Sequence, residues 1–196
     1  MDAKRRRPGA REAIIAAATE LIRVNGVAGT SIADVIAASG TSAGAIYYHF
    51  GSKERLVLEV GKAAMAVPMA MILQTSTGLS PAALFAAALE RVAREEGVAE
   101  MLLQIWAGAK SDPGLERLLL TEVGTVKANI MAFIGTWCGE QGPTTDPAAL
   151  ANLIIGLITG FAVQRGLGVD IDPDAYRDLG VRLLETALVA ASSSPS

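Results

Sequence analysis

Apolar residues recur at helical spacing along this chain. The first stripe lies at positions i, i+4, i+7 and i+8 and consists of Ile14, Ala18, Leu21 and Ile22. Residues at this spacing share one face of a helix, which we expect to end near Asn25-Gly26. Aromatic residues make up only 5% of the chain and β-branched runs are short, so the pattern favours helices packed on helices. The sequence therefore predicts an all-α protein.

Two short helices are predicted between Thr30 and Leu56, in the segment TSIADVIAASGTSAGAIYYHFGSKERL. Ser31 is followed three positions later by Asp34, which is a capping-box pattern at the start of the first of them. Gly40 supplies a turn, and Ser42 can cap the second helix. A helix, a tight turn and a short second helix are the layout of a DNA-reading helix-turn-helix.

Helix-breaking residues divide the remainder of the chain. A fourth helix is predicted to begin near Ser52-Lys53 and to run toward Met71, with Pro68 kinking or splitting it and so forming a joint between two domains. Beyond it, breakers separate about five further helices. These breakers are Gly78 to Pro81, Gly97, Asp112 to Gly114, Gly139 to Pro147 and Gly166 to Pro173. The chain should therefore contain about nine helices.

Charge is distributed unevenly along the chain. Residues 1–62 hold nine basic and six acidic residues, the rest holds eight and fourteen, and the formal net charge is −3. A basic front end on an acidic body suits a chain that brings one end to a polyanion such as DNA. Charged residues that only solvate their helix faces would give the same distribution, so charge alone leaves both interpretations open.

Few residues suit disulfide, metal or membrane chemistry. Cys138 is the only cysteine and His49 the only histidine, so neither an internal disulfide nor a zinc cluster is expected. The longest apolar run, Ala148 to Val163, contains Asn152 and Thr159 and is too short to span a bilayer. We expect a buried helix there, no membrane partner, no cofactor and a reducing, cytoplasmic location.

The residues after Gly40 closely resemble those of the TetR family of bacterial transcriptional regulators. The matching pattern is Gly40-x-Ser42-x-Gly44-x-x-Tyr47-x-x-Phe50-x-x-Lys53-x-x-Leu56. The resemblance covers about residues 11–60, and the C-terminal part fits the family only by its length, helix count and breakers. It implies a homodimer that places two helix-turn-helix modules in successive major grooves of a palindromic operator. It also implies a C-terminal domain that binds a small molecule and then releases the DNA.

The resemblance and the breakers together suggest five segments. They are a basic flexible arm (1–10), a helix-turn-helix DNA-binding domain (11–56), a connecting fourth helix (57–77), a ligand-binding and dimerisation domain (78–191) and a disordered tail (192–196). The expected function is that of a TetR-like regulator, most simply a repressor released by a hydrophobic small molecule. The alternative is a helical small-molecule-binding protein that does not bind DNA.

The predicted DNA contacts fall into a positioning group and a reading group. Tyr47 and Lys53 are expected to contact the phosphate backbone, whereas Phe50 is expected in the core. The reading helix has no Arg, Asn or Gln between Ala43 and Tyr48, so methyl contacts and DNA shape should carry specificity. The arm is expected to add minor-groove contacts. The full set is Lys4, Arg5, Arg6, Arg7, Ser31, Thr41, Ser42, Ala43, Gly44, Ala45, Tyr47, Tyr48, His49 and Lys53.

Several members of this set have a second interpretation. Ser31, Thr41 and Ser42 can donate to phosphate, but they can also serve only as helix caps and turn formers. Tyr48 and His49 could face either the groove or the DNA backbone, and for His49 we favour a backbone contact over a place in the core.

The middle helices carry apolar and aromatic residues that could line a ligand cavity. The candidates are Phe85, Met101, Gln104, Ile105, Trp106, Ile130, Met131, Phe133, Ile134 and Trp137. Each could equally be a core residue. Their Trp and Met content favours a fairly large hydrophobic or aromatic ligand.

Two C-terminal stripes suggest where a dimer could form. Gly156 and Gly160 would let two helices approach closely, and the last helix carries a leucine stripe. The candidate interface residues are Leu153, Gly156, Leu157, Gly160, Gln164, Leu179, Leu183, Leu184 and Ala187. Alternatively, both stripes complete the core of one protomer.

Two motif matches do not indicate chemistry. Residues 40–44 satisfy the G-x-S-x-G pattern of hydrolases, but they follow a helix rather than a strand. Asp170, Asp172 and Asp174 resemble the start of a calcium loop, yet Ala175 and Val181 occupy its sixth and twelfth positions. Helix-capping acids are the better interpretation, and no enzyme activity is expected.

Overall fold

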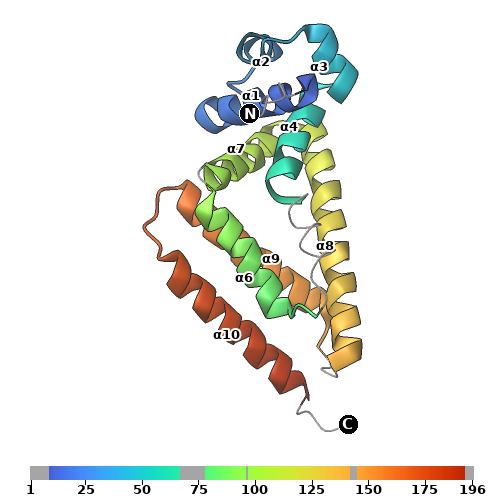
Figure 1. The fold of residues 1–196 in the computed structure, drawn as a ribbon, viewed down its shortest axis with the longest axis vertical. Helices are drawn as coiled ribbons and strands as arrows, with labels where there is room; N and C mark the ends of the chain where they lie inside the picture. Colours follow the sequence, from blue (N-terminus) through green and yellow to red (C-terminus); the bar gives the residue numbers. More distant parts are fainter. Residues whose placement is uncertain (1–8, 67–77, 96, 142–144, 193–196) are drawn as a thin grey trace, which may run out of the picture.

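The computed structural model describes residues 9–66, 78–95, 97–141 and 145–192 (Figure 1). Within these ranges the chain forms nine α-helices and one π-helical turn, and no β-strand, which confirms the all-α prediction. The elements are α1 (Ala10–Asn25), α2 (Ile32–Ser39), α3 (Ala43–Phe50), α4 (Lys53–Gly61), η1 (Lys62–Ala66), α6 (Pro81–Arg94), α7 (Val98–Ser111), α8 (Pro113–Gln141), α9 (Pro147–Gly166) and α10 (Pro173–Ser192).

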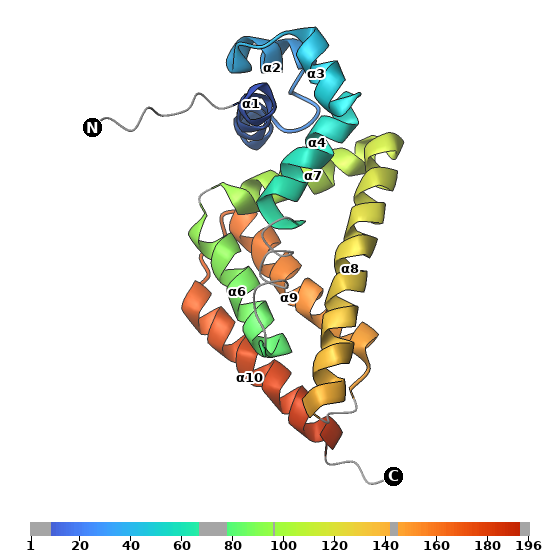
Figure 2. The same ribbon diagram turned by 45° about the vertical axis from the view of Figure 1, so that its right-hand side comes forward.

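Helices α1, α2 and α3 form a small head at one end of the molecule (Figures 1 and 2). The predicted capping box is present, because the Ser31 side chain accepts from the Asp34 amide and the Asp34 carboxylate accepts from the Ser31 amide. Gly40 adopts a left-handed conformation with φ of 64° that ends α2. The Ser42 side chain then caps α3 by accepting from the Ala45 amide. Local sequence therefore defines both helices of the turn.

The rest of the chain forms a helical body in which the predicted breakers separate the helices. Pro81, Pro113, Pro147 and Pro173 each stand at the first residue of a helix, where a missing amide hydrogen costs nothing. Gly97 takes φ of 79° just before α7. Helix α8 runs along one side of the body, while α6 and α10 pack side by side on the other (Figure 2). Helix α9 packs against both α7 and α8.

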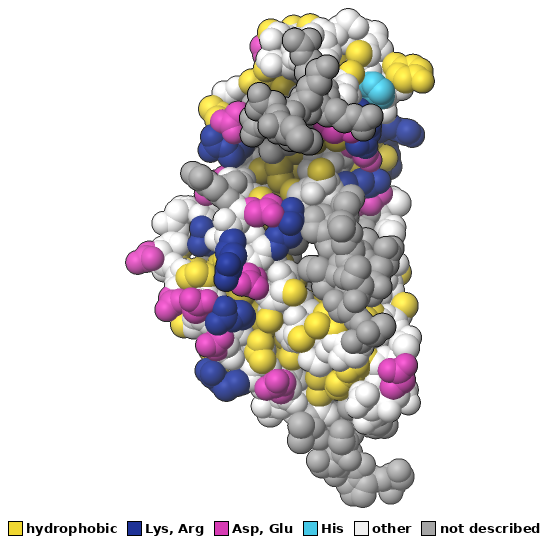
Figure 3. All heavy atoms as spheres, viewed as in Figure 1, with side chains coloured by type: hydrophobic (Ala, Val, Ile, Leu, Met, Phe, Trp, Pro, Cys, Tyr) yellow, Lys and Arg dark blue, Asp and Glu magenta, His cyan; other side chains and the backbone are white. Residues whose placement is uncertain are grey.

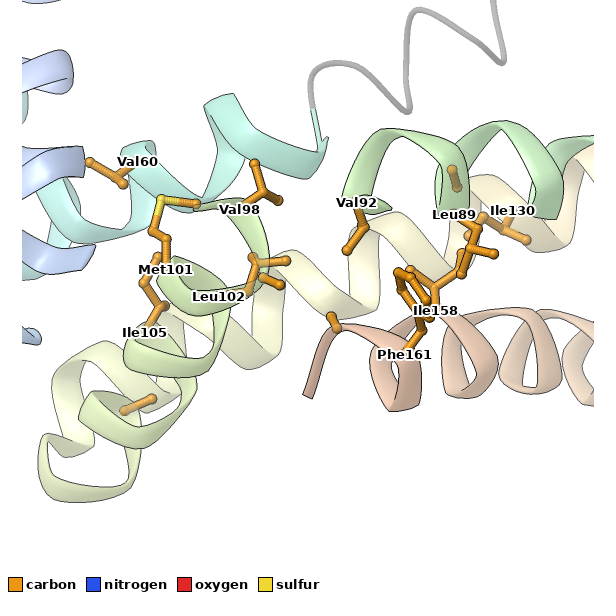
Figure 4. Packing of buried hydrophobic residues seen from close by; sticks show 14 of the residues in the cluster. Val60, Leu89, Val92, Val98, Met101, Leu102, Ile105, Ile130, Ile158 and Phe161 are labelled. Atoms are coloured by element: carbon orange, nitrogen blue, oxygen red, sulfur yellow. The ribbon is translucent and has the colours of Figure 1, made fainter. Parts of the chain in front are cut away.

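One apolar core runs from the head into the body. Ile14, Ala18 and Ile22 of α1 are fully or almost fully buried, as the predicted stripe requires. The same cluster continues through α4 and α7 to α6, α8 and α9 (Figure 4). Because α4 and α7 each pack against α1, the head and the body are joined by apolar contacts as well as by the chain.

The fourth helix is shorter than predicted. Its α-helical part ends at Gly61, and the chain continues as the π-helical turn Lys62–Ala66. Nothing in the hydrophobic pattern signals this change of winding. Pro68 and Met71 lie outside the described residues.

Helices α8 and α9 are long and apolar enough to cross a membrane by length and composition alone, a test that the core helix of a soluble protein also passes. Only 33% of the most apolar window of α9 is buried. Ile154 and Phe161 face the core, while Leu153 and Gly156 are exposed on the opposite side. The predicted buried helix is therefore buried along one face only.

Asp172 is a helix cap. Its Oδ1 accepts from the amides of Asp174 and Ala175 at distances of 2.9 and 3.1 Å, at the start of α10. This confirms helix capping as the interpretation of that acidic segment.

Candidate functional site

The outer face of α3 presents two tyrosines and a histidine to solvent. Tyr48 is 85% exposed and Tyr47 54% exposed, and the histidine is visible on the surface of the head (Figure 3). Ile46 and Phe50, on the other side of the same helix, are buried. Large side chains that gain nothing from the core are thus displayed on a helix held rigidly from beneath.

The start of α3 offers small groups beside these aromatic residues. Ala43 and Gly44 are exposed, Ala45 is half-buried, and no heavy atom of a neighbouring side chain or loop other than Ser42 Oγ comes within 4 Å of a Cβ placed at Gly44. This surface lets another molecule approach the α3 backbone closely. The structure therefore brings the predicted reading residues together on one face.

The predicted hydroxyl contacts all have partners within the head. The Ser31 hydroxyl donates to Asp34 Oδ2 at 2.6 Å, and Thr41 Oγ1 shares a hydrogen bond with Ser39 Oγ at 2.7 Å. Ser42 Oγ accepts from an amide, which leaves its hydroxyl hydrogen able to donate outward. Capping and outward donation can coexist at Ser42 more readily than at Ser31.

Lys53 occupies the first position of α4 and is half-buried. Hydrogen bonds from the Ser31 side chain and amide, together with the charge of Lys53, lower the pKa of the Asp34 carboxyl below its ordinary value. Lys53 therefore lies in the electrostatic neighbourhood of the α2 start, beside the α3 face. The arm residues Lys4, Arg5, Arg6 and Arg7 lie outside the described residues.

A chain of ion pairs connects the head to the body. Arg11 on α1 pairs with Glu59 on α4, Glu59 lies 3.5 Å from the Lys62 ammonium, and Lys62 Nζ lies 2.7 Å from Glu122 Oε1 on α8. The Arg11 guanidinium also lies 5.6 Å from the ring centroid of Phe50, at the end of α3. We call Arg11, Glu59, Lys62 and Glu122 the ion-pair chain.

The position of Lys62 in this chain changes its chemistry. Its hydrogen bond to Glu122, with the charge of Glu59 nearby, raises the pKa of the ammonium above its ordinary value. Sequence inspection could have found the Glu59 and Lys62 pair, which lie three residues apart on one helical turn. It could not have found Arg11 and Glu122, which are brought in by other helices.

An apolar cavity of about 150 Å³ lies between the end of α4, α7, α8 and α9. It is lined by Leu58, Gly61, Lys62, Leu102, Ile105, Trp106, Leu119, Glu122, Val123, Val126, Ile130, Ile155, Ile158, Thr159 and Ala162. Lys62 and Glu122 are the only charged groups in this lining, and Thr159 supplies a hydroxyl. The cavity thus combines an apolar wall with one end of the ion-pair chain.

The predicted ligand residues divide between the cavity and other places. Ile105, Trp106 and Ile130 line it. Phe85 is buried where α6 meets Gly180 of α10, and Gln104 lies against Gly26 at the junction of head and body. Met101 and Ile134 are buried in the core, while Met131, Phe133 and Trp137 are partly buried against it. The contribution of α9, chiefly Ile155, Ile158 and Thr159, carried no aromatic or sulfur signal in the sequence.

Part of the predicted dimer stripe forms an exposed apolar surface. Leu153 of α9 and Leu179 and Leu183 of α10 are exposed, and a Cβ at Gly156 would meet open space.

The other members of the predicted stripe have partners within the protomer. Leu184 is fully buried and Ala187 is half-buried. The Leu157 carbonyl accepts from the Tyr176 hydroxyl at 2.9 Å, and the Gln164 side chain donates to the Gly160 carbonyl. Leu184 therefore belongs to the core of the protomer.

Comparison with known families gives two matches along the chain. A family model described as bacterial regulatory proteins, tetR family, matches residues 14–60. A second, described as BetI-type transcriptional repressor, C-terminal, matches residues 82–189, which is more than half of the chain. The two models meet the head and the body respectively.

Individual proteins resemble the chain in sequence or in fold. The HTH-type transcriptional regulator LmrA of Bacillus subtilis is 46% identical over 50 residues, which are 25% of this chain and 27% of LmrA. Salmonella enterica GusR superposes with a TM-score of 0.73 at 20% identity, covering 96% of this chain and all of GusR. The transcriptional regulator FadR of Bacillus subtilis, in complex with stearoyl-CoA, superposes with a TM-score of 0.70 at 18% identity, covering 88% of this chain and 96% of FadR. At these identities the two structures share the fold.

Proposed function

Because the chain belongs to the TetR family of bacterial regulatory proteins, we propose that it represses transcription as a homodimer bound to a two-fold symmetric operator. A small apolar molecule that occupies the cavity would release the dimer from DNA. The protein would act in the cytoplasm on chromosomal DNA. The observation that carries this proposal is an exposed reading helix joined, through α4, to the wall of an apolar cavity.

The head supplies the means of contacting DNA. Tyr47 and Tyr48 stand exposed on α3 beside a start of small residues, so the helix can enter a major groove without steric hindrance. Lys53 and the hydroxyl of Ser42 lie at helix N-termini, where backbone amides also favour phosphate. Arg, Asn and Gln are absent from α3, so base reading would depend on methyl contacts and on DNA shape.

The exposed apolar surface of α9 and α10 supplies a site for a second copy. Leu153, Leu179 and Leu183 gain nothing from the protomer core, whereas a partner with the same surface would bury them. Gly156 has room for a close approach of helices. One short reading helix makes few contacts, and a two-fold dimer doubles them at half-sites about one helical turn apart.

The cavity supplies a means of control. FadR is bound to stearoyl-CoA in a related fold, which supports an apolar effector for this chain as well. Leu58, Gly61 and Lys62 at the end of α4 and start of η1 line the cavity, and α4 also packs on α1 and α3. A ligand that prefers a shifted α4 would therefore change the spacing of the two reading helices, because it stabilises one of two conformations.

Selection of bound duplexes from a random DNA pool, with the purified full-length protein, tests the DNA part of the proposal. We expect an enriched inverted repeat whose half-sites are about one helical turn apart. A pool with no enriched sequence would instead favour the alternative of a small-molecule-binding protein without DNA binding. The variant Arg94→Ala, on α6 and far from the head, is the matched control because it removes a surface charge without touching α3.

A further inference from the structure

The charged part of the cavity wall is not symmetric toward ligands of opposite sign. Lys62 has two carboxylate partners, Glu122 at 2.7 Å and Glu59 at 3.5 Å. In the described part of the chain, Glu122 forms an ion pair with Lys62 alone. Both side chains are about three-quarters buried, with exposed fractions of 30% for Lys62 and 25% for Glu122.

A ligand with a negative group would have to take Lys62 from Glu122. That exchange would leave the Glu122 carboxylate without a cation in a mostly apolar surrounding, which is costly for a partly desolvated charge. A ligand with a positive group would instead take Glu122 from Lys62. The displaced ammonium retains Glu59 as a partner, so neither charge is left alone.

From this asymmetry we infer that the cavity binds an apolar cation, whose positive group pairs with Glu122 and moves Lys62 toward Glu59. The inference rests on the proposed function, since it names the effector class of the proposed cavity. The size of the cavity limits the apolar part, because an engineered cavity of about 150 Å³ in another protein takes up benzene. A primary or small quaternary amine on a six-carbon group fits both requirements.

The displacement has a route to the head. Glu59 is shared between Lys62 and Arg11, so a closer Lys62 weakens the hold of Glu59 on Arg11. The Arg11 guanidinium lies over Phe50, which closes the buried side of α3. The ion-pair chain therefore transmits the arrival of a cation at α8 to the end of the reading helix.

Three six-carbon compounds test the inference directly: the hexylammonium cation, hexan-1-ol and the hexanoate anion. They share an alkyl chain and differ in charge at neutral pH. Binding to the full-length protein is followed by calorimetry and by the fluorescence of Trp106, which lines the cavity. We expect hexylammonium to bind about tenfold more tightly than hexan-1-ol, and hexanoate to bind no better than the alcohol. Hexanoate as the tightest ligand, or hexylammonium without an advantage over the alcohol, would overturn the inference.

Two substitutions should move the affinity for hexylammonium in opposite directions. Glu122→Gln removes the acceptor charge, so the tenfold advantage over hexan-1-ol should vanish while the affinity for the alcohol stays unchanged. Lys62→Met removes the competing ammonium, so hexylammonium should bind about threefold more tightly than to the parent protein. Glu116→Gln, on the same helix but in an exposed pair with Lys110, is the control and should change neither affinity. An effect of the same sign from both cavity variants would contradict the assignment.

The outcomes separate the inference from the proposed function. If the three compounds bind equally, the cavity takes small apolar molecules but does not select cations, and only the inference fails. If none binds, the effector role of the cavity fails with it. Operator binding without ligand is measured independently by mobility shift, so a loss there would reject the regulator itself.

Discussion

The outer face of α3 and the wall of the cavity use large side chains in opposite ways. On α3, Tyr47 and Tyr48 are exposed and contribute little to the core. Around the cavity, Ile105, Ile130 and Ile158 are at least nine-tenths buried and hold four helices together. The difference shows that the head separates its contact residues from its folding residues, whereas in the body the same residues serve both purposes. Substitutions on the two surfaces should therefore have separable effects on binding and on stability.

The largest effect is expected where the α3 face rests on its own core. Ile46→Ala removes a fully buried side chain beneath the reading helix and should lower the free energy of unfolding by about 3 kcal/mol. Tyr48→Ala, from the 85% exposed neighbour two positions along, should lower it by less than about 0.5 kcal/mol. Urea denaturation of both variants measures the contrast. A Tyr48 variant as unstable as the Ile46 variant would show that the two roles are not separated.

The exposed surface of α9 and α10 provides a second test, because it resembles the α3 face in exposure but not in purpose. Leu179→Glu combined with Leu183→Glu should place charges in the proposed dimer contact and give monomers in sedimentation experiments. Operator affinity should then fall on the order of a hundredfold, since each half-site would be bound alone. Leu120→Glu, at an equally exposed leucine on α8, is the control. A double variant that remains dimeric would exclude this surface as the interface.

Contacts to phosphate should appear as a change in salt dependence. Lys53→Met keeps most of the apolar stem at the start of α4 but removes the charge. Operator affinity should fall by about tenfold, and the slope of log affinity against log salt should become shallower by about one. Mobility shifts at several salt concentrations give both quantities. A slope equal to that of the parent protein would show that Lys53 makes no phosphate contact.

Helix caps in the head should contribute modestly to stability. Ser42→Ala removes the acceptor for the Ala45 amide and should cost about 1 kcal/mol of unfolding free energy. Ser42→Asp restores an acceptor and should recover stability, yet its negative charge should weaken DNA binding. Thermal unfolding and mobility shifts of the same pair separate the two effects. Equal DNA affinities for both variants would place Ser42 away from the phosphates.

The smallest effect concerns acid. Hydrogen bonds from Ser31 lower the pKa of Asp34 in the folded protein below its ordinary value of 3.8. The contribution of this carboxylate to stability is therefore present above about pH 4 and is lost as the pH falls through the folded pKa. Asp34→Ala should flatten the corresponding part of the stability curve between about pH 5 and pH 2. Curves of the same shape for both proteins would show that the capping box does not titrate with folding.

The head was accessible to sequence reasoning because its decisive interactions are short-range. Ser31 with Asp34, and Ser42 with Ala45, lie three residues apart, and Gly40 marks a left-handed turn. The breakers of the body were equally local, which is why the helices begin at Pro81, Pro113, Pro147 and Pro173. The end of α4 at Gly61 and the π-helical turn after it were not predicted, since a change of winding leaves no mark in the apolar pattern.

The cavity could be predicted only in part. Ile105 and Trp106 stand out by size and lie on its wall, but Phe85 and Gln104 share that appearance and face other neighbours. Their apolar or polar character is the same in either place. What differs is the rotation of one helix against another, which depends on packing along its whole length.

The sequence by itself determined the all-helical class, the helix-turn-helix with its caps, and the resemblance to TetR regulators, because these depend on residues a few positions apart. The tertiary structure alone decided that Glu122 of α8 meets Lys62, that Lys62 lies beside Glu59, and that Arg11 completes the chain above Phe50. Arg11 and Glu122 are separated by more than a hundred residues. Ion pairs between such distant residues follow from how helices pack, and the packing free energy is shared among many apolar contacts that no single motif records.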